Sequence, residues 1–173
     1  MSVDKQESDT ASMIPSSIDM ASIISQLEED GVAFSYEHEG NDALNAKLVE
    51  VIDEAEAEGY EHPGIIVLGA KQPGNGDERD IAQAAADAMD SDLMMLRTPG
   101  SAAVVSREHA RADIESVQYT LATTTDYVAG ARSVVEDLPG SSVGAVPLAV
   151  GTLALVAAAT VFSVRWSKRL HRQ

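Results

Sequence analysis

Apolar residues recur at helical spacing in two stretches of the first half of the chain. Residues 16–32 (SSIDMASIISQLEEDGV) predict a helix that ends at Gly31, because a glycine commonly closes a helix. Residues 41–59 (NDALNAKLVEVIDEAEAEG) predict the clearest helix of the chain, with Asn41 or Asp42 as its cap. The apolar stripe of this second helix consists of Leu44, Leu48, Val51, Ile52 and Ala55.

The middle of the chain alternates short apolar runs with helical patterns. The wholly apolar run at 63–70 (PGIIVLGA) predicts a strand that is buried on both faces, and 77–90 predicts the helix that follows it. The runs at 91–98 and 102–106 predict two strands joined as a hairpin by the Pro-Gly turn between them. Residues 33–40 (AFSYEHEG) fit either a loop or a short edge strand, and residues 108–137 are helical again.

This order of elements predicts an α/β fold, a small mixed sheet flanked by helices. The expected domain covers residues 14–138, after a polar, acidic and disordered start at 1–13. A short linker at 139–142 then leads to the last two segments, an apolar run at 143–164 and a basic tail at 165–173.

The apolar run at 143–164 (VGAVPLAVGTLALVAAATVFSV) predicts one transmembrane helix. Between Asp137 and Arg165 no side chain is ionisable. A helix of about 20 residues spans the hydrocarbon core of a bilayer, and this run is apolar on every face, whereas buried helices of soluble proteins are shorter or amphipathic. The start of the chain lacks the basic and apolar regions of a signal peptide, so this helix is expected to be the only membrane-targeting element.

Charge divides the chain into two parts of opposite sign. The formal net charge is -16, and all 28 acidic residues precede the apolar run together with eight of the 12 basic residues, which leaves -20 on that part. A charge of this size makes nucleic acid and anionic lipid headgroups poor partners for the domain and favours cations or a basic protein. The absence of cysteine excludes disulfides and thiolate chemistry.

One loop carries candidate chemistry. Residues 71–80 (KQPGNGDERD) follow the first buried strand, at the edge of the sheet where α/β proteins bind ligands. The carboxylates of Asp77, Glu78 and Asp80 could bind Ca²⁺ or Mg²⁺, or they could instead cap and complement the positive end of the following helix. His38, His62 and His109 are scattered, and no nucleophile, base and orienting group come together in the sequence.

Three features together resemble a known family. The opening MIPSSIDMASIISQLEEDGVAF, the GIIVLG strand with its acidic loop, and a single C-terminal span look like a family of small membrane proteins from mycobacteria and corynebacteria. The function of that family is not assigned, and its members are often encoded beside peptidoglycan hydrolases. The helix at 41–59 with the strand, helix and hairpin after it is also similar to TPM domains, for which phosphatase activity and divalent-cation binding are described.

The resemblance and the residues lead to two hypotheses. The first is a non-enzymatic, single-pass module of the cell envelope that contacts the lipid bilayer through 143–164 and binds a protein partner near cell-wall remodelling enzymes. The alternative is a TPM-type phosphatase that depends on Ca²⁺ or Mg²⁺ held by Asp77, Glu78 and Asp80. The basic tail predicts that the tail stays in the cytoplasm and the acidic domain lies outside, although a cytoplasmic tail-anchored arrangement is the competing reading.

Overall fold

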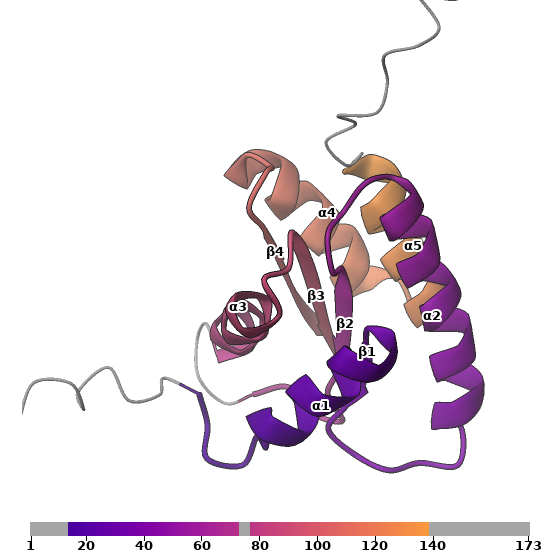
Figure 1. Cartoon of the computed structure of the whole chain (residues 1–173), viewed down its shortest axis with the longest axis vertical. Helices are drawn as coiled ribbons and strands as arrows, with labels where there is room; N and C mark the ends of the chain where they lie inside the picture. The colour runs from indigo at the N-terminus through magenta and orange to yellow at the C-terminus, as the bar shows by residue number, and fades with distance from the viewer. Residues whose placement is uncertain (1–13, 73–76, 139–173) are drawn as a thin grey trace, which may run out of the picture. The chain divides into compact units, whose positions relative to one another are not determined.

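The computed structural model describes residues 14–72 and 77–138, which form five helices and four strands (Figure 1). The elements in chain order are α1 (Met20–Asp30), β1 (Val32–Phe34), α2 (Asn41–Ala57), β2 (Gly64–Val67), α3 (Asp77–Met89), β3 (Leu93–Thr98), β4 (Ser101–Ser106), α4 (Arg111–Thr123) and α5 (Tyr127–Asp137). This confirms the predicted α/β class with a small mixed sheet.

The four strands form one sheet in the order β1-β2-β3-β4, so β1 lies at one edge. β1, β2 and β3 run parallel, with Val32 opposite Ile65 and Ile65 opposite Met95. β4 returns antiparallel to β3, which confirms the predicted hairpin. The stretch at 33–40 that fitted either a loop or an edge strand contains the last two residues of β1, a short edge strand, followed by a loop.

Helices cover both faces of the sheet with separate apolar cores. α2, α4 and α5 pack on the face that carries Val32, Ile65 and Met95. α1 and α3 pack on the opposite face, against Ile66 and Met94. All four residues of β2 are buried, because both of its faces are covered.

The two crossovers between the parallel strands have opposite hands. The steps from β1 to β2 and from β2 to β3 move across the sheet in the same direction, but α2 lies on one face and α3 on the other (Figure 1). Because the strands are parallel and the direction of movement is the same, a change of face reverses the handedness. One of the two connections is therefore left-handed, in contrast to the strong right-handed preference of such units.

The predicted cap of α2 is wrong. Neither Asn41 nor Asp42 caps the helix through its side chain, since the N-cap position is Gly40 and no side-chain hydrogen bond closes this end. The Asn41 side chain instead donates its amide to the carbonyl oxygen of Tyr36 at 2.7 Å. The asparagine therefore stabilises the loop before the helix rather than the exposed N–H groups of its first turn.

The predicted transmembrane helix at 143–164 lies outside the described residues, as do the predicted disordered start, the linker and the basic tail. Within residues 14–72 and 77–138, none of the helices combines the length and apolar character that crossing a bilayer requires.

Tyr60 ties the end of the domain to the loop between α2 and β2. Its side chain is 4% exposed, and its hydroxyl donates a hydrogen bond to the carbonyl oxygen of Leu138, directly after α5. The His109 ring lies beside the Tyr60 ring, with the two centroids 5.9 Å apart. Burial, and then the nearby carboxylates of Glu108, Glu58 and Asp92, raise the pKa of the Tyr60 hydroxyl from 10.0 to about 12.

The raised pKa of Tyr60 predicts a loss of stability in alkaline solution. Above pH 10 the unfolded chain releases the phenol proton while the folded chain keeps it, so the free energy of unfolding falls as the pH rises from 10 towards about 12. The fall is at most about 1.4 kcal/mol per pH unit. Urea unfolding of the full chain at pH 9, 10 and 11 should show a larger fall in wild type than in Tyr60→Phe.

Tyr119→Phe is the matched control for this measurement, because the Tyr119 side chain is 72% exposed. Its free energy of unfolding should fall with pH as much as that of the wild-type chain. Equal pH dependence of the free energy of unfolding in Tyr60→Phe and wild type would contradict a raised pKa of the Tyr60 hydroxyl.

Candidate functional site

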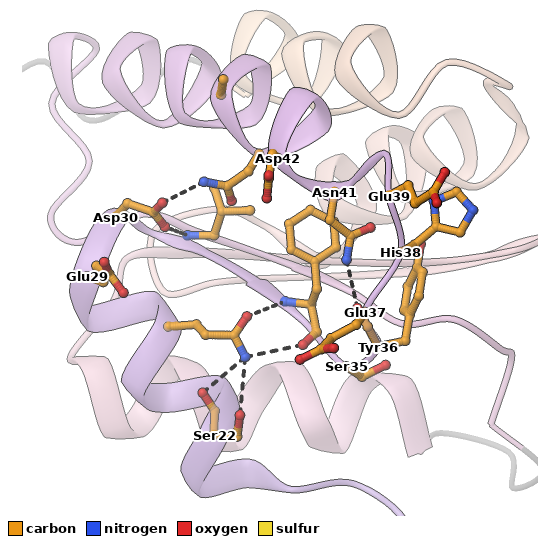
Figure 2. Close-up of a pocket in the computed structure, with 15 residues that line it drawn as sticks. Ser22, Glu29, Asp30, Ser35, Tyr36, Glu37, His38, Glu39, Asn41 and Asp42 are labelled. Carbon is orange, nitrogen blue, oxygen red and sulfur yellow. Dashed lines mark hydrogen bonds between the residues drawn. The ribbon is translucent and has the colours of Figure 1, made fainter.

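An open groove of about 1340 Å³ runs along the free edge of the sheet (Figure 2). Strand β1 lies at its floor. One wall is α1, and the other is formed by the loop after β1 and the first turns of α2.

A glycine turn places α1 beside β1. Gly31 has φ 78°, and its N–H donates to the carbonyl oxygen of Leu27 at 2.9 Å, which ends the helix as the sequence predicted. A Cβ at this position would lie 2.9 Å from Cγ2 of Ile52, so the turn also needs the absence of a side chain. Only one residue separates helix and strand, and the helix therefore folds back along the strand that it precedes.

Aromatic packing positions the loop after β1, which forms part of the second wall of the groove. The Phe34 and Tyr36 rings meet edge to face, with centroids 6.3 Å apart. The Tyr36 ring also lies against Gly69, where a Cβ would come within 3.0 Å of the ring. Burial, and then the neighbouring Tyr127, raise the pKa of the Tyr36 hydroxyl, which is thus neutral at physiological pH.

Among the described residues, five carboxylates line the groove, namely Glu29, Asp30, Glu37, Glu39 and Asp42, and no lysine or arginine lines it. Figure 2 shows Glu29 and Asp30 towards one end and the loop acids towards the other. Asp30 is held in place, since its Oδ1 accepts from the N–H of Val32 at 3.0 Å and its Oδ2 from Nδ2 of Asn45 at 2.7 Å. The groove therefore has a concentrated negative potential.

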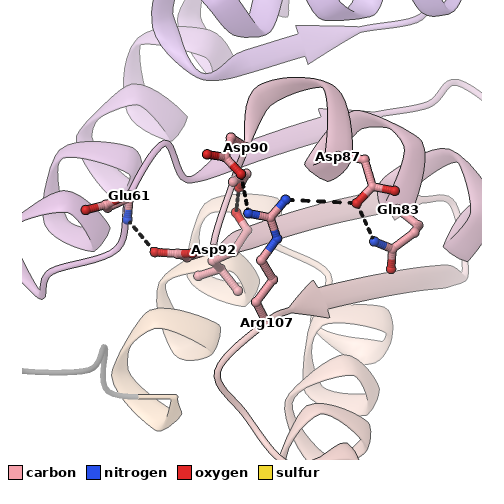
Figure 3. Close-up of polar contacts among 8 residues, drawn as sticks. Glu61, Gln83, Asp87, Asp90, Asp92 and Arg107 are labelled. Carbon is pink, nitrogen blue, oxygen red and sulfur yellow. Dashed lines mark hydrogen bonds and ion pairs between the residues drawn. The ribbon is translucent and has the colours of Figure 1, made fainter.

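Some acidic residues elsewhere on the domain are paired with arginines. Arg107 contacts Asp90 through a hydrogen-bonded ion pair and lies 4.0 Å from Asp87 (Figure 3). The hydrogen bond from Arg107 lowers the pKa of the Asp90 carboxyl. Arg132 pairs with Glu54 at 2.8 Å and lowers the pKa of that carboxyl in the same way. The groove differs from these two sites because none of the described residues that line it is a lysine or arginine that would pair with its carboxylates.

Side chains occupy the hydrogen-bonding groups on the open edge of β1. The N–H of Phe34 donates to Oε1 of Gln26 at 3.0 Å, and Nε2 of Gln26 donates to the carbonyl oxygen of Phe34 at 3.2 Å. The same Nε2 also contacts the backbone oxygen and the hydroxyl of Ser22, both at 3.3 Å (Figure 2). A glutamine of α1 thus takes the place of a neighbouring strand at Phe34.

The three predicted metal ligands lie in the first turn of α3. Glu78 is 6% exposed, and its Oε1 accepts from the N–H of Gln72 at 3.2 Å, so it ties the preceding loop to the helix. Asp77 and Asp80 are half-buried beside it. Among the described residues, no group of three or more acids or histidines is arranged to hold a metal ion. Residues 73–76 of the same loop lie outside the description, and the Ca²⁺ or Mg²⁺ site stays a prediction.

The three histidines of the described residues lie apart, as the sequence indicated. His38 lines the groove, and its Nδ1 accepts from the N–H of Gly40 at 3.1 Å. His109 lies 2.9 Å from the Ser106 hydroxyl through its Nδ1, beside Tyr60. His62 has a positive φ of 48° in the loop that leads to β2.

Sequence reasoning did not find the acidic groove. Its five acids come from the end of one helix, a loop and the start of the next helix, so they are divided among three different elements. A signal was present in the stretch EEDGVAFSYEHEGND, where acids flank a short apolar run on both sides. That pattern indicates an edge strand with acidic residues at each of its ends.

Comparison with known proteins identifies the family. The family model described as Membrane protein Rv1476 matches residues 13–173, which is nearly the whole chain. The chain belongs to the Membrane protein Rv1476 family. Membership in this family confirms a membrane protein and supports the predicted actinobacterial membrane family, while the likeness to TPM domains stays a prediction. No curated protein and no solved structure matches the chain.

Proposed function

We propose that this chain is a non-enzymatic, single-pass membrane protein of the cell envelope whose α/β domain binds a basic segment of a partner protein in the acidic groove. One observation carries the proposal: within residues 14–72 and 77–138, five carboxylates line the groove and no lysine or arginine lies among them. Opposite charges attract over several ångströms and speed association, so a segment rich in lysine and arginine is the favoured occupant.

The distribution of the carboxylates favours an extended cation over a single metal ion. A Ca²⁺ site gathers six to eight oxygen atoms around one point. The groove acids are instead spread from the end of α1 to the start of α2, and the described residues hold no cluster with metal-binding geometry. Charges arranged along a groove complement a peptide with several basic side chains.

The membrane anchor in this proposal is the apolar run at 143–164. Membership in a membrane protein family supports membrane attachment, and this run is the segment of the sequence with the length and composition of a span. Basic flanking residues favour the cytoplasmic side of a span, so in this proposal the basic tail lies in the cytoplasm and the domain outside. The partner then belongs to the envelope, where it lies near the enzymes that remodel the cell wall.

Peptide binding to the full chain in non-ionic detergent tests the proposed function. The probe is a fluorescent seven-residue peptide of alternating lysine and threonine, compared with the same peptide in which glutamate replaces lysine. The basic peptide should bind, with affinity that falls as salt is added, and the acidic peptide should not. The variant Glu37→Gln/Glu39→Gln/Asp42→Asn should weaken binding of the basic peptide by about 10-fold, because it removes three attractive charges.

The matched control is Glu50→Gln/Asp53→Asn/Glu56→Gln. It removes the same number of glutamates and aspartates from exposed positions of α2 that do not line the groove. The control should keep nearly wild-type affinity. Equal losses in the two triple variants would show that net charge alone attracts the peptide, and this would contradict a role for the groove.

A further inference from the structure

Strand β1 is an open edge of the sheet, since β2 pairs with only one of its sides. Exposed edges can accept another strand, and proteins commonly block this with side chains, charges or covering elements. Here the outward N–H of Val32 is occupied by Asp30, and the outward N–H and C=O of Phe34 are both occupied by Gln26. The edge is covered by side chains rather than by backbone.

Gln26 offers Phe34 the groups that a neighbouring strand would offer. A carboxamide has one acceptor oxygen and one N–H₂ donor, which is the chemistry of a peptide group. Its two hydrogen bonds to Phe34 are 3.0 and 3.2 Å long, and both join a half-buried side chain to the edge strand of the sheet. A long side chain can rotate away from such a position, and an incoming backbone would restore both hydrogen bonds.

We propose that the basic segment binds as an added β-strand on β1, where its backbone replaces the carboxamide of Gln26 at Phe34. This inference rests on the proposed function and specifies how the same groove recognises its partner. Backbone pairing supplies the register, and side chains that alternate to the two faces of the new strand supply the charge. Carboxylates are available on both sides, from Glu29 on the α1 wall and from Asp42 on the α2 wall.

Charge decides between the two kinds of strand that could add to this edge. A second copy of the same chain would bring its own five groove carboxylates against the first set, and like charges at close range repel. A partner segment with lysine or arginine reverses the sign of this interaction. The occupant is therefore a basic segment of another protein in extended conformation.

Backbone methylation of the probe tests strand addition on the wild-type full chain in detergent. The lysine–threonine peptide is compared with a version that is N-methylated at alternate residues, which keeps every side chain and charge but removes backbone donors. The methylated peptide should bind about 10-fold more weakly or worse. Hydrogen exchange at the Phe34 amide should slow when the unmodified peptide binds, and it should not slow with the methylated one.

The variant Gln26→Ala gives the second arm of the test. It frees the edge in advance, so the unmodified peptide should bind about 3- to 10-fold more tightly than to wild type. The control is Gln83→Ala, since Gln83 is an exposed glutamine of α3 whose Nε2 contacts Oδ1 of Asp87 at 3.0 Å, away from the groove. Gln83→Ala should leave the affinity unchanged.

Different contrary outcomes would overturn strand addition, the proposed function or the basic partner. Equal binding of both peptides by wild type overturns strand addition but leaves the acidic groove as a binding site. No binding of the basic peptide overturns the proposed function itself. Dimerisation of Gln26→Ala without peptide, measured by light scattering, overturns the basic partner in favour of a second copy. The comparison of peptides on wild type needs no variant, so it decides the inference even where Gln26→Ala folds poorly.

Discussion

Replacing Arg97 by alanine is expected to lower the free energy of unfolding by about 2–4 kcal/mol. Arg97 lies in β3 with 6% of its surface exposed, and its guanidinium is bonded to backbone carbonyls. Nη1 donates to the oxygens of Thr98 at 2.7 Å and Ser101 at 3.0 Å, and Nη2 donates to the oxygen of Thr124 at 3.2 Å. Alanine would leave three carbonyls without these donors and open a space in the core.

The position of these carbonyls explains the size of the expected effect. Thr98 and Ser101 flank the turn between β3 and β4, while Thr124 ends α4, so one side chain connects the hairpin to the α4–α5 junction. The guanidinium carbon also lies 4.9 Å from the centre of the Tyr127 ring, in cation–π geometry. Its Nε is buried and has no hydrogen-bond partner in the described part of the chain. The charge is stabilised by carbonyl and ring dipoles.

Two further variants separate hydrogen bonding from packing. Arg97→Met keeps most of the side-chain volume and loses the hydrogen-bond donors. Its free energy of unfolding should therefore lie between those of wild type and Arg97→Ala. Arg132→Ala removes an exposed arginine that pairs with Glu54 and should cost less than about 1 kcal/mol. Urea unfolding of the full chain in non-ionic detergent, followed by circular dichroism, measures all three. An Arg97→Ala chain as stable as Arg132→Ala would refute the bridging role.

Local patterns predicted most of the fold because they report burial directly. The run GIIV is apolar without alternation, and β2 is indeed buried on both faces. The stripe of α2 was also predictable, since Leu48, Val51 and Ile52 recur at helical spacing and all lie in the core. These features depend on near neighbours in the chain, and the sequence alone contains that information.

Features that depend on contacts between distant residues were not predictable in the same way. Arg97 is the single charged residue of its strand, and its polar partners include Thr124, 27 positions away. Asn41 has the residue type of a cap, but the carbonyl of Tyr36 takes its amide. In both cases tertiary structure supplies a partner that propensity does not anticipate.

The groove itself was predictable only in part. Its acids are visible in the sequence, but their common orientation arises because Gly31 reverses the chain and β1 takes the edge position. α1 lies on one face of the sheet and α2 on the other, so the groove at the β1 edge has a wall on each side.

Protease added to intact spheroplasts is expected to digest the acidic domain and to leave the basic tail protected. The tail carries Arg165, Lys168, Arg169 and Arg172, and the segment before the apolar run carries acids. Moving a positive charge across the membrane against the potential costs about 2.3 kcal/mol per 100 mV, so four charges cost roughly 9 kcal/mol. Basic flanks therefore hold their side of a span in the cytoplasm.

Neutralising the tail tests the cause of this orientation. A chain with glutamine at the four basic positions should show a mixture of protected and digested domains, because the bias between the two orientations is lost. Glu136→Gln/Asp137→Asn changes the charge on the other side of the run and should keep the wild-type pattern, since acidic residues contribute little to topology. A domain that survives protease until the membrane is broken would place the groove in the cytoplasm. The basic partner would then have to be sought there, and binding of the lysine–threonine peptide would still report on the groove because it does not depend on the side of the membrane.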